Sequence, residues 1–73
     1  MKDNKRAIAD LDRTIELNPN HAVAYSSRGF AKSAIKDYKG AIADFDKVIE
    51  LNPENADQYR QLMKTVKEKL YSL

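Results

Sequence analysis

The chain has 73 residues and a formal net charge of +2, with one third of its residues charged and no cysteine. This length allows one small domain, and the missing cysteines exclude disulfides and thiolate metal sites as its support. The slight charge argues against nucleic-acid binding, and no apolar run is long enough to cross a bilayer. Residues 1–4 do not resemble the start of a secretory signal. We therefore expect a soluble intracellular protein or a piece of one, cytoplasmic by default, with neither a membrane nor a nucleic acid as partner.

Four helices are predicted in chain order. Apolar side chains recur at helical spacing in residues 4–17 and again in 39–51. Each of these two helices ends at a Leu-Asn-Pro sequence, because proline cannot continue the helical hydrogen-bond ladder. Residues 22–36 between them are rich in alanine and serine, and a last helix, 55–71, is expected to begin at a capping Asn55. No strand pattern is present and the connections are short, so the fold class is all-α with neighbouring helices antiparallel.

The first and third helices are copies of one another. Residues 7–20 read AIADLDRTIELNPN, and residues 41–54, which lie 34 positions later, read AIADFDKVIELNPE; ten of the fourteen positions are identical. A fixed period in the low thirties indicates stacked helical repeats, in which one unit cannot bury its apolar face alone. The repeat therefore favours a binding protein over an enzyme. Its apolar stripe places the central core at Tyr25, Ala41, Ile42, Phe45, Val48 and Ile49.

A set of small and large residues at fixed positions resembles the tetratricopeptide repeat, a 34-residue helix–turn–helix unit. These residues are Tyr25, Gly29, Ala31, Tyr38, Ala41, Phe45 and Pro53. The resemblance implies an antiparallel helical-hairpin repeat, a short α-solenoid segment of four helices in a right-handed pile. It divides the chain into the second half of a unit (2–21), a complete unit (22–55) and a terminal or capping helix (56–73), and suggests a fragment of a longer array.

Two groups of charged residues are expected at the surface. Arg28 and Lys32 occupy positions where the family commonly has leucine and tyrosine, so their stems should lie along the helix interface while their charged ends reach solvent. Carboxylates recur with the repeat and lie off the apolar stripe, where Arg13 and Lys47 suit exposed ion pairs. The recurring carboxylates are Asp10, Asp12 and Glu16 in the first copy and Asp44, Asp46 and Glu50 in the second.

No residue pattern indicates catalysis, a metal or a cofactor. His21 is the only histidine, and in a chain without cysteine it has no partner for a metal site or for acid–base chemistry. We expect it to be an ordinary loop residue near a helix start. Ser26, Ser27 and Ser33 have no base or oxyanion-hole loop that would make them nucleophiles. We therefore predict that the chain is not an enzyme and uses no cofactor.

The resemblance places a peptide-binding groove on the first helix of each unit. The groove positions are Val23, Ser26, Phe30 and Ser33 in the complete unit, and a basic row of Arg60, Lys64 and Lys67 in the last helix. Phe30 either touches a ligand or is merely half-buried, and the basic row either attracts acidic peptides or is a solvated face. In the groove hypothesis, Phe30 and the basic row share one concavity. The lysine/asparagine set with which some members clamp the carboxylate of chaperone tails is missing.

Three functions are considered. The leading one is a protein-interaction scaffold that binds a peptide or partner protein on the concave face of the stacked helices. The second is self-association. Ile8, Leu11 and Ile15 are apolar and have no preceding helix to cover them. We therefore expect a homo-oligomer, with a dimer as the main form, whose interface includes the first helix. RNA binding is a third hypothesis, disfavoured because the groove positions of the complete unit are not basic.

Overall fold

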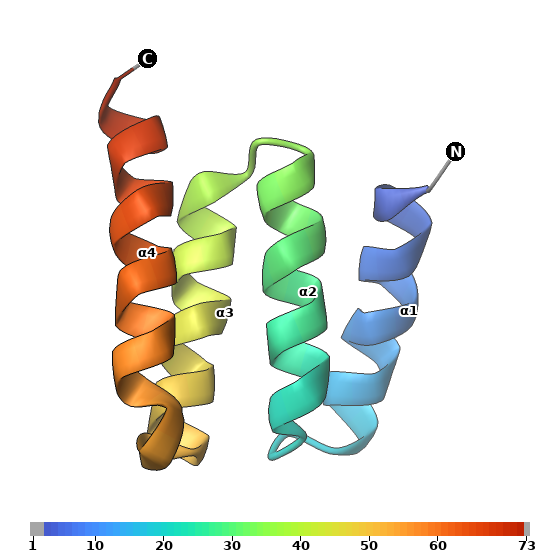
Figure 1. The fold of residues 1–73 in the computed structure, drawn as a ribbon. Helices are drawn as coiled ribbons and strands as arrows, with labels where there is room; N and C mark the ends of the chain where they lie inside the picture. Colours follow the sequence, from blue (N-terminus) through green and yellow to red (C-terminus); the bar gives the residue numbers. More distant parts are fainter. Residues whose placement is uncertain (1–2, 73) are drawn as a thin grey trace.

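The computed structural model describes residues 3–72, which form four α-helices and one short 3-10 turn (Figure 1). These elements are α1 (Asn4–Leu17), α2 (Ala22–Ala34), α3 (Tyr38–Leu51), the turn η1 (Pro53–Asn55) and α4 (Ala56–Tyr71). No strand occurs among these residues, so the predicted all-α fold of four helices is confirmed. No helix in this range has both the length and the apolar character that a membrane span requires.

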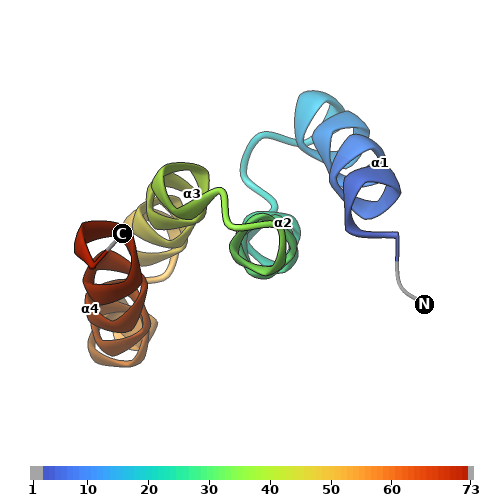
Figure 2. The same cartoon turned by 90° about the horizontal axis from the view of Figure 1, so that it is seen from above.

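Successive helices run antiparallel, and each packs on the next: α1 on α2, α2 on α3, and α3 on α4. Seen from above, α2 and α4 lie on one side of the row and α1 and α3 on the other, with α1 and α4 at its two ends (Figure 2). The molecule measures 34 × 32 × 17 Å. Its shortest dimension is less than two helix diameters of about 10–12 Å each. So thin a slab leaves much of every helix surface open to solvent.

Three side chains cap the starts of α1, α2 and α3 by accepting a hydrogen bond from a backbone N–H in the first turn of the helix. Asp3 before α1 and Asp37 before α3 each accept from the N–H three residues further on, at 3.1 Å. The ring Nδ1 of His21 accepts from the third residue after it at 3.2 Å, so this histidine caps α2. Asn55 makes no such bond, and the predicted cap there is wrong; α4 instead follows directly from the 3-10 turn η1.

The second helix ends two residues earlier than predicted, at Ala34. Lys36 has a φ of 67°, in the left-handed region that a right-handed helix cannot contain. The backbone N–H groups of Lys36 and Asp37 donate back to the carbonyls of Ser33 and Lys32, at 3.0 and 2.8 Å. This pair of bonds is the Schellman pattern, in which glycine usually occupies the left-handed position. Here a lysine holds it, at some cost in backbone strain.

The core lies on both sides of α3, around the ring of Phe45, which is 1% exposed. The rings of Phe30 from α2 and Tyr59 from α4 contact it, with centroids 5.1 and 5.7 Å away. Gly29 is required beside it, because a Cβ there would lie 2.7 Å from the ring. The predicted core is confirmed at four positions, while two isoleucines lie at its margin. Tyr25, Ala41, Phe45 and Val48 are buried, whereas Ile42 and Ile49 are half-buried.

Candidate functional site

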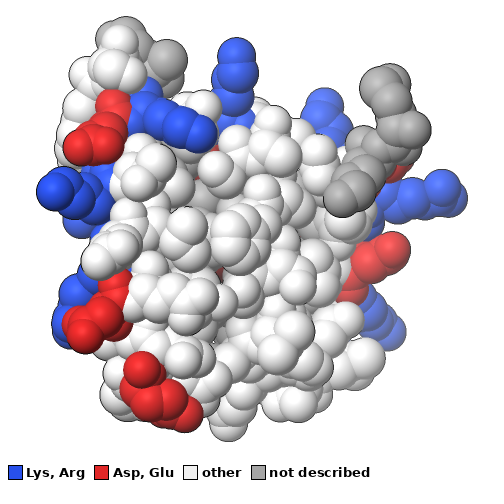
Figure 3. Space-filling view, in the orientation of Figure 1, with Lys and Arg blue, Asp and Glu red and all other residues white. Residues whose placement is uncertain are grey.

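The main candidate for ligand contact is Phe30 on α2, whose side chain is 50% exposed. Its ring meets the buried ring of Phe45 edge-on, so it is supported from behind while its outer surface stays open. Beside it lies a hollow that uncharged residues of α4 complete, namely Gln58, Gln61, Leu62 and Thr65. Figure 3 shows that the face formed by α2 and α4 is uncharged across its middle, with lysine, arginine and acidic side chains along its edges.

A second hollow borders Phe30 on the side of α1. Its α2 wall consists of small residues, and small side chains leave room next to a helix. The lining residues other than Phe30 are Asn4, Ala7, Leu11, Ser27, Ala31 and Ala34. Phe30 therefore stands as a ridge between two hollows, and a polypeptide lying across α2 would contact its ring from both sides.

The other predicted groove residues of α2 have different environments. Val23 is 68% exposed and free to contact a ligand. The hydroxyl of Ser26 lies 2.7 Å from that of Tyr59, a hydrogen bond that ties α2 to α4. Val23 and Ser26 also line a smaller third hollow beside Tyr59. Ser33 is half-buried. Among the four residues, Phe30 and Val23 thus offer the most open apolar surface.

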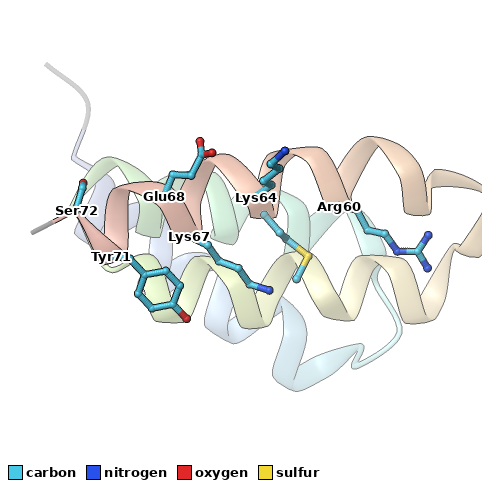
Figure 4. A pocket seen from close by; sticks show the side chains of 7 residues that line it. Arg60, Lys64, Lys67, Glu68, Tyr71 and Ser72 are labelled. Atoms are coloured by element: carbon cyan, nitrogen blue, oxygen red, sulfur yellow. The ribbon is translucent and has the colours of Figure 1, made fainter.

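The basic row of α4 is not part of the face around Phe30. Arg60, Lys64 and Lys67 are exposed and border a separate hollow of about 660 Å³; Lys64 extends from one side of α4, and Arg60 and Lys67 extend from the other (Figure 4). The same hollow is completed by Met63, Glu68, Tyr71 and Ser72. Phe30 and the basic row therefore border different hollows, and the expectation that they face one concavity stays a prediction. Residues 58, 61 and 65 form one helical stripe, and the basic row follows another.

A charged cluster joins α1, α2 and α3. Arg28 of α2 donates to Asp44 of α3 from Nε at 2.9 Å and from Nη2 at 2.7 Å, and to Asp12 of α1 from Nη1 at 2.8 Å. Lys32 Nζ lies 3.4 Å from the same Asp44 carboxylate. The hydrogen bonds to Asp44 raise the pKa of Arg28 above its usual value, although burial acts in the opposite direction. The paired guanidinium is therefore charged at every pH at which the protein would be studied.

Two sequence predictions fail at this cluster. Asp44 is 3% exposed rather than solvated, and the charged ends of Arg28 and Lys32 reach it instead of solvent. A buried carboxylate requires such partners, because an unpaired charge is costly away from water. The burial of Asp44 could have been predicted from its position, because it lies three residues after Ala41 and four before Val48, on the buried stripe of α3. The other five recurring carboxylates are exposed, as predicted.

The chemistry available on the face around Phe30 is that of contact and hydrogen bonding. Gln58 and Gln61 supply amide donors and acceptors, Thr65 supplies a hydroxyl, and Phe30 supplies an apolar surface. Such a mixture can hold a polypeptide backbone together with an apolar side chain. Within residues 3–72, no three His, Asp or Glu side chains are placed to hold a metal ion.

The architecture is that of an antiparallel helical-hairpin repeat, in which α2 and α3 form one hairpin and the chain repeats every 34 residues. Residues 22–55 match the family model of the tetratricopeptide repeat. Repeats of this family are typically non-catalytic scaffold units that mediate protein–protein interactions. No curated protein and no solved structure matches the chain.

Proposed function

We propose that the chain binds a peptide, or a segment of a partner protein, across the face of α2 and α4. The observation that carries this proposal is the half-exposed ring of Phe30, supported edge-on by Phe45 and flanked by two hollows. Full burial of a phenylalanine side chain stabilises by roughly 1.5–3 kcal/mol. About half of that remains unrealised at Phe30, and a bound apolar side chain would recover it.

The surroundings of Phe30 define the ligand. An apolar side chain of the ligand would contact the ring of Phe30, and the backbone of the ligand would hydrogen-bond to the side-chain amides of Gln58 and Gln61. No charged residue lines this hollow, so binding should change little with ionic strength. This expectation differs from that for the basic row, where an acidic peptide would bind more weakly as salt screens the exposed charges.

A displayed library of random peptides, selected against the folded chain, tests the proposal with Phe30→Ala and Tyr71→Ala as matched variants. Both residues are exposed aromatic side chains, but Tyr71 lies outside the two hollows that border Phe30. Phe30→Ala should lower the affinity for the selected peptides about ten-fold or more, while Tyr71→Ala leaves it unchanged. Equal binding by the two variants would contradict the proposal. A large loss of thermal stability on Phe30→Ala alone would instead assign the ring to the core.

Self-association is a second candidate function, because α1 is poorly covered. None of its residues is buried, Ile8, Leu11 and Ile15 are half-buried, and Leu17 is 73% exposed. Apolar surface concentrated on one helix favours contact with another molecule. Sedimentation over a range of concentrations measures it: the average mass should rise with concentration, and a well-folded monomer at high concentration would count against this candidate.

A further inference from the structure

We propose that the peptide bound between α2 and α4 is an uncharged, proline-rich segment in the polyproline II conformation, with two apolar residues three positions apart. One apolar residue would contact Phe30 on the side of α4. The other would enter the smaller hollow that Val23 and Tyr59 border. This inference rests on the proposed function and specifies the ligand of the same site.

The hollow beside Phe30 and the hollow beside Tyr59 follow one another along α2 and α4. Because successive helices are antiparallel, α2 and α4 run in the same direction (Figure 1). Val23 and Tyr59 belong to the N-terminal halves of these helices, whereas Phe30 belongs to the C-terminal half of α2. Val48 of α3, which is 2% exposed, lies at the base of the hollow beside Tyr59. A ligand lying along α2 would therefore meet the two hollows in turn.

Both hollows are uncharged, although one third of the residues of the chain are charged. The residues that line them carry only apolar, hydroxyl and amide side chains. A charged side chain of the ligand would lose water there without gaining a counter-charge, and such burial is costly. Charge complementarity therefore favours an uncharged segment, in contrast to the acidic peptide that the basic row would attract.

In each hollow, side-chain amides accompany an aromatic ring. These groups are Gln58 and Gln61 with Phe30, and Asn52 and Asn55 with Tyr59. When a ligand covers the amides, they lose water and need new hydrogen-bond partners. A ligand helix supplies none from its backbone, because its N–H and C=O groups are bonded within the helix. A polyproline II segment has no internal hydrogen bonds, so its backbone carbonyls are free to accept from the amides.

The spacing of the hollows distinguishes polyproline II from a β-strand. Phe30 follows Val23 by seven positions, which is about 10.5 Å along a helix at 1.5 Å per residue. In polyproline II, residues three positions apart lie on the same side and about 9.3 Å apart. In a β-strand, residues on the same side lie about 6.6 or 13.2 Å apart, at two or four positions. The polyproline II repeat is the closest match, and a proline-rich segment adopts it with little loss of entropy on binding.

Three peptides with acetylated and amidated ends, titrated into the folded chain and followed by nuclear magnetic resonance, test the ligand. The first, Pro-Leu-Pro-Pro-Leu-Pro, has leucines three positions apart. The second, Pro-Leu-Pro-Leu-Pro-Pro, has the same composition with leucines two apart, and the third has glycine in place of every proline. The first peptide should bind about ten-fold or more tightly than either of the others, because only it is preorganised with the matching spacing.

Two variants of exposed aliphatic residues test the second hollow. Val23 is 68% exposed and Leu17 is 73% exposed, and Leu17 lines neither hollow. Val23→Ala should weaken binding of the first peptide about three- to ten-fold, because two methyl groups are removed from the contact. Leu17→Ala should leave the affinity unchanged. Circular dichroism of both variants checks that they remain folded.

The remaining outcomes separate this inference from the proposed function. Absence of binding by the first peptide, equal binding of the three peptides, or equal affinity of wild type and Val23→Ala would each overturn the polyproline II ligand. The proposed function would still stand if peptides selected from the random library required Phe30. If neither the selected peptides nor the three designed ones required Phe30, both proposals would fail.

Discussion

Replacing Arg28 with leucine should destabilise the fold far more than removing any exposed charge. The substitution deletes all three hydrogen bonds of the guanidinium, two to Asp44 and one to Asp12. It leaves the Asp44 side chain, which is 4% exposed, with only Lys32 Nζ at 3.4 Å as a charged partner. Leucine itself suits the position, because Leu62 is the equivalent residue of α4. The loss of stability in Arg28→Leu therefore measures the cost of leaving the buried Asp44 carboxylate without its main partner.

Removing one partner of a buried ion pair typically costs about 3–5 kcal/mol. The lower end, about 3 kcal/mol, applies here because Lys32 remains and the Arg28 side chain is 17% exposed. A chain of this length has a free energy of unfolding of roughly 4–11 kcal/mol. The melting temperature should fall by roughly 12–24 °C, at 4–8 °C for each kcal/mol in a domain of this size.

Thermal unfolding followed by circular dichroism measures this change, with Asp12→Ala as the control. Asp12 also bonds to Arg28, but its side chain is 56% exposed, so the control should lose less than about 1 kcal/mol. The double variant Arg28→Leu with Asp44→Leu removes both buried charges and should recover most of the lost stability. Wild-type melting of Arg28→Leu, or a double variant less stable than the single one, would refute this account of the cluster.

Two further predictions concern single backbone positions. Gly29→Ala should lower the free energy of unfolding by about 1–3 kcal/mol, because its Cβ would lie 2.7 Å from the Phe45 ring. The double variant Gly29→Ala with Phe45→Leu should lose less stability than the sum of the two single variants. Strictly additive losses in thermal melts would show that the two residues do not contact each other. Lys36→Gly should raise the free energy of unfolding by about 1 kcal/mol, because φ is 67° there and glycine adopts that conformation without strain. Lys36→Ala, the control, should show no such gain when unfolding is measured with denaturant. A gain in both variants would point to a cause other than φ.

The helices and the repeat could be predicted from the amino-acid sequence alone. Both follow from local rules: apolar residues at a spacing of three and four positions define each helix, and Pro19 and Pro53 end the helices before them. The offset of 34 residues then implied stacked hairpins. The choice of Phe30 as a candidate ligand contact also came from the sequence, because the residue is apolar and lies on a second helical stripe of α2; its half-exposed ring, which also contacts Phe45 of α3, keeps it a candidate.

Which stripe of a helix faces which neighbouring helix depends on the packing of the whole fold. On a helix, positions two residues apart point in nearly opposite directions, so the rotation of α4 about its own axis determines whether Gln58 or Arg60 faces Phe30. That rotation is set by the packing of α4 against α3, which no local pattern in α4 contains. The position of Asp44 on the buried stripe can be read from the sequence, but its pairing with Arg28 and Lys32 follows only from the contact of α2 with α3. Periodicity gives the faces of each helix, but the choice between them is made by contacts between residues far apart in the chain.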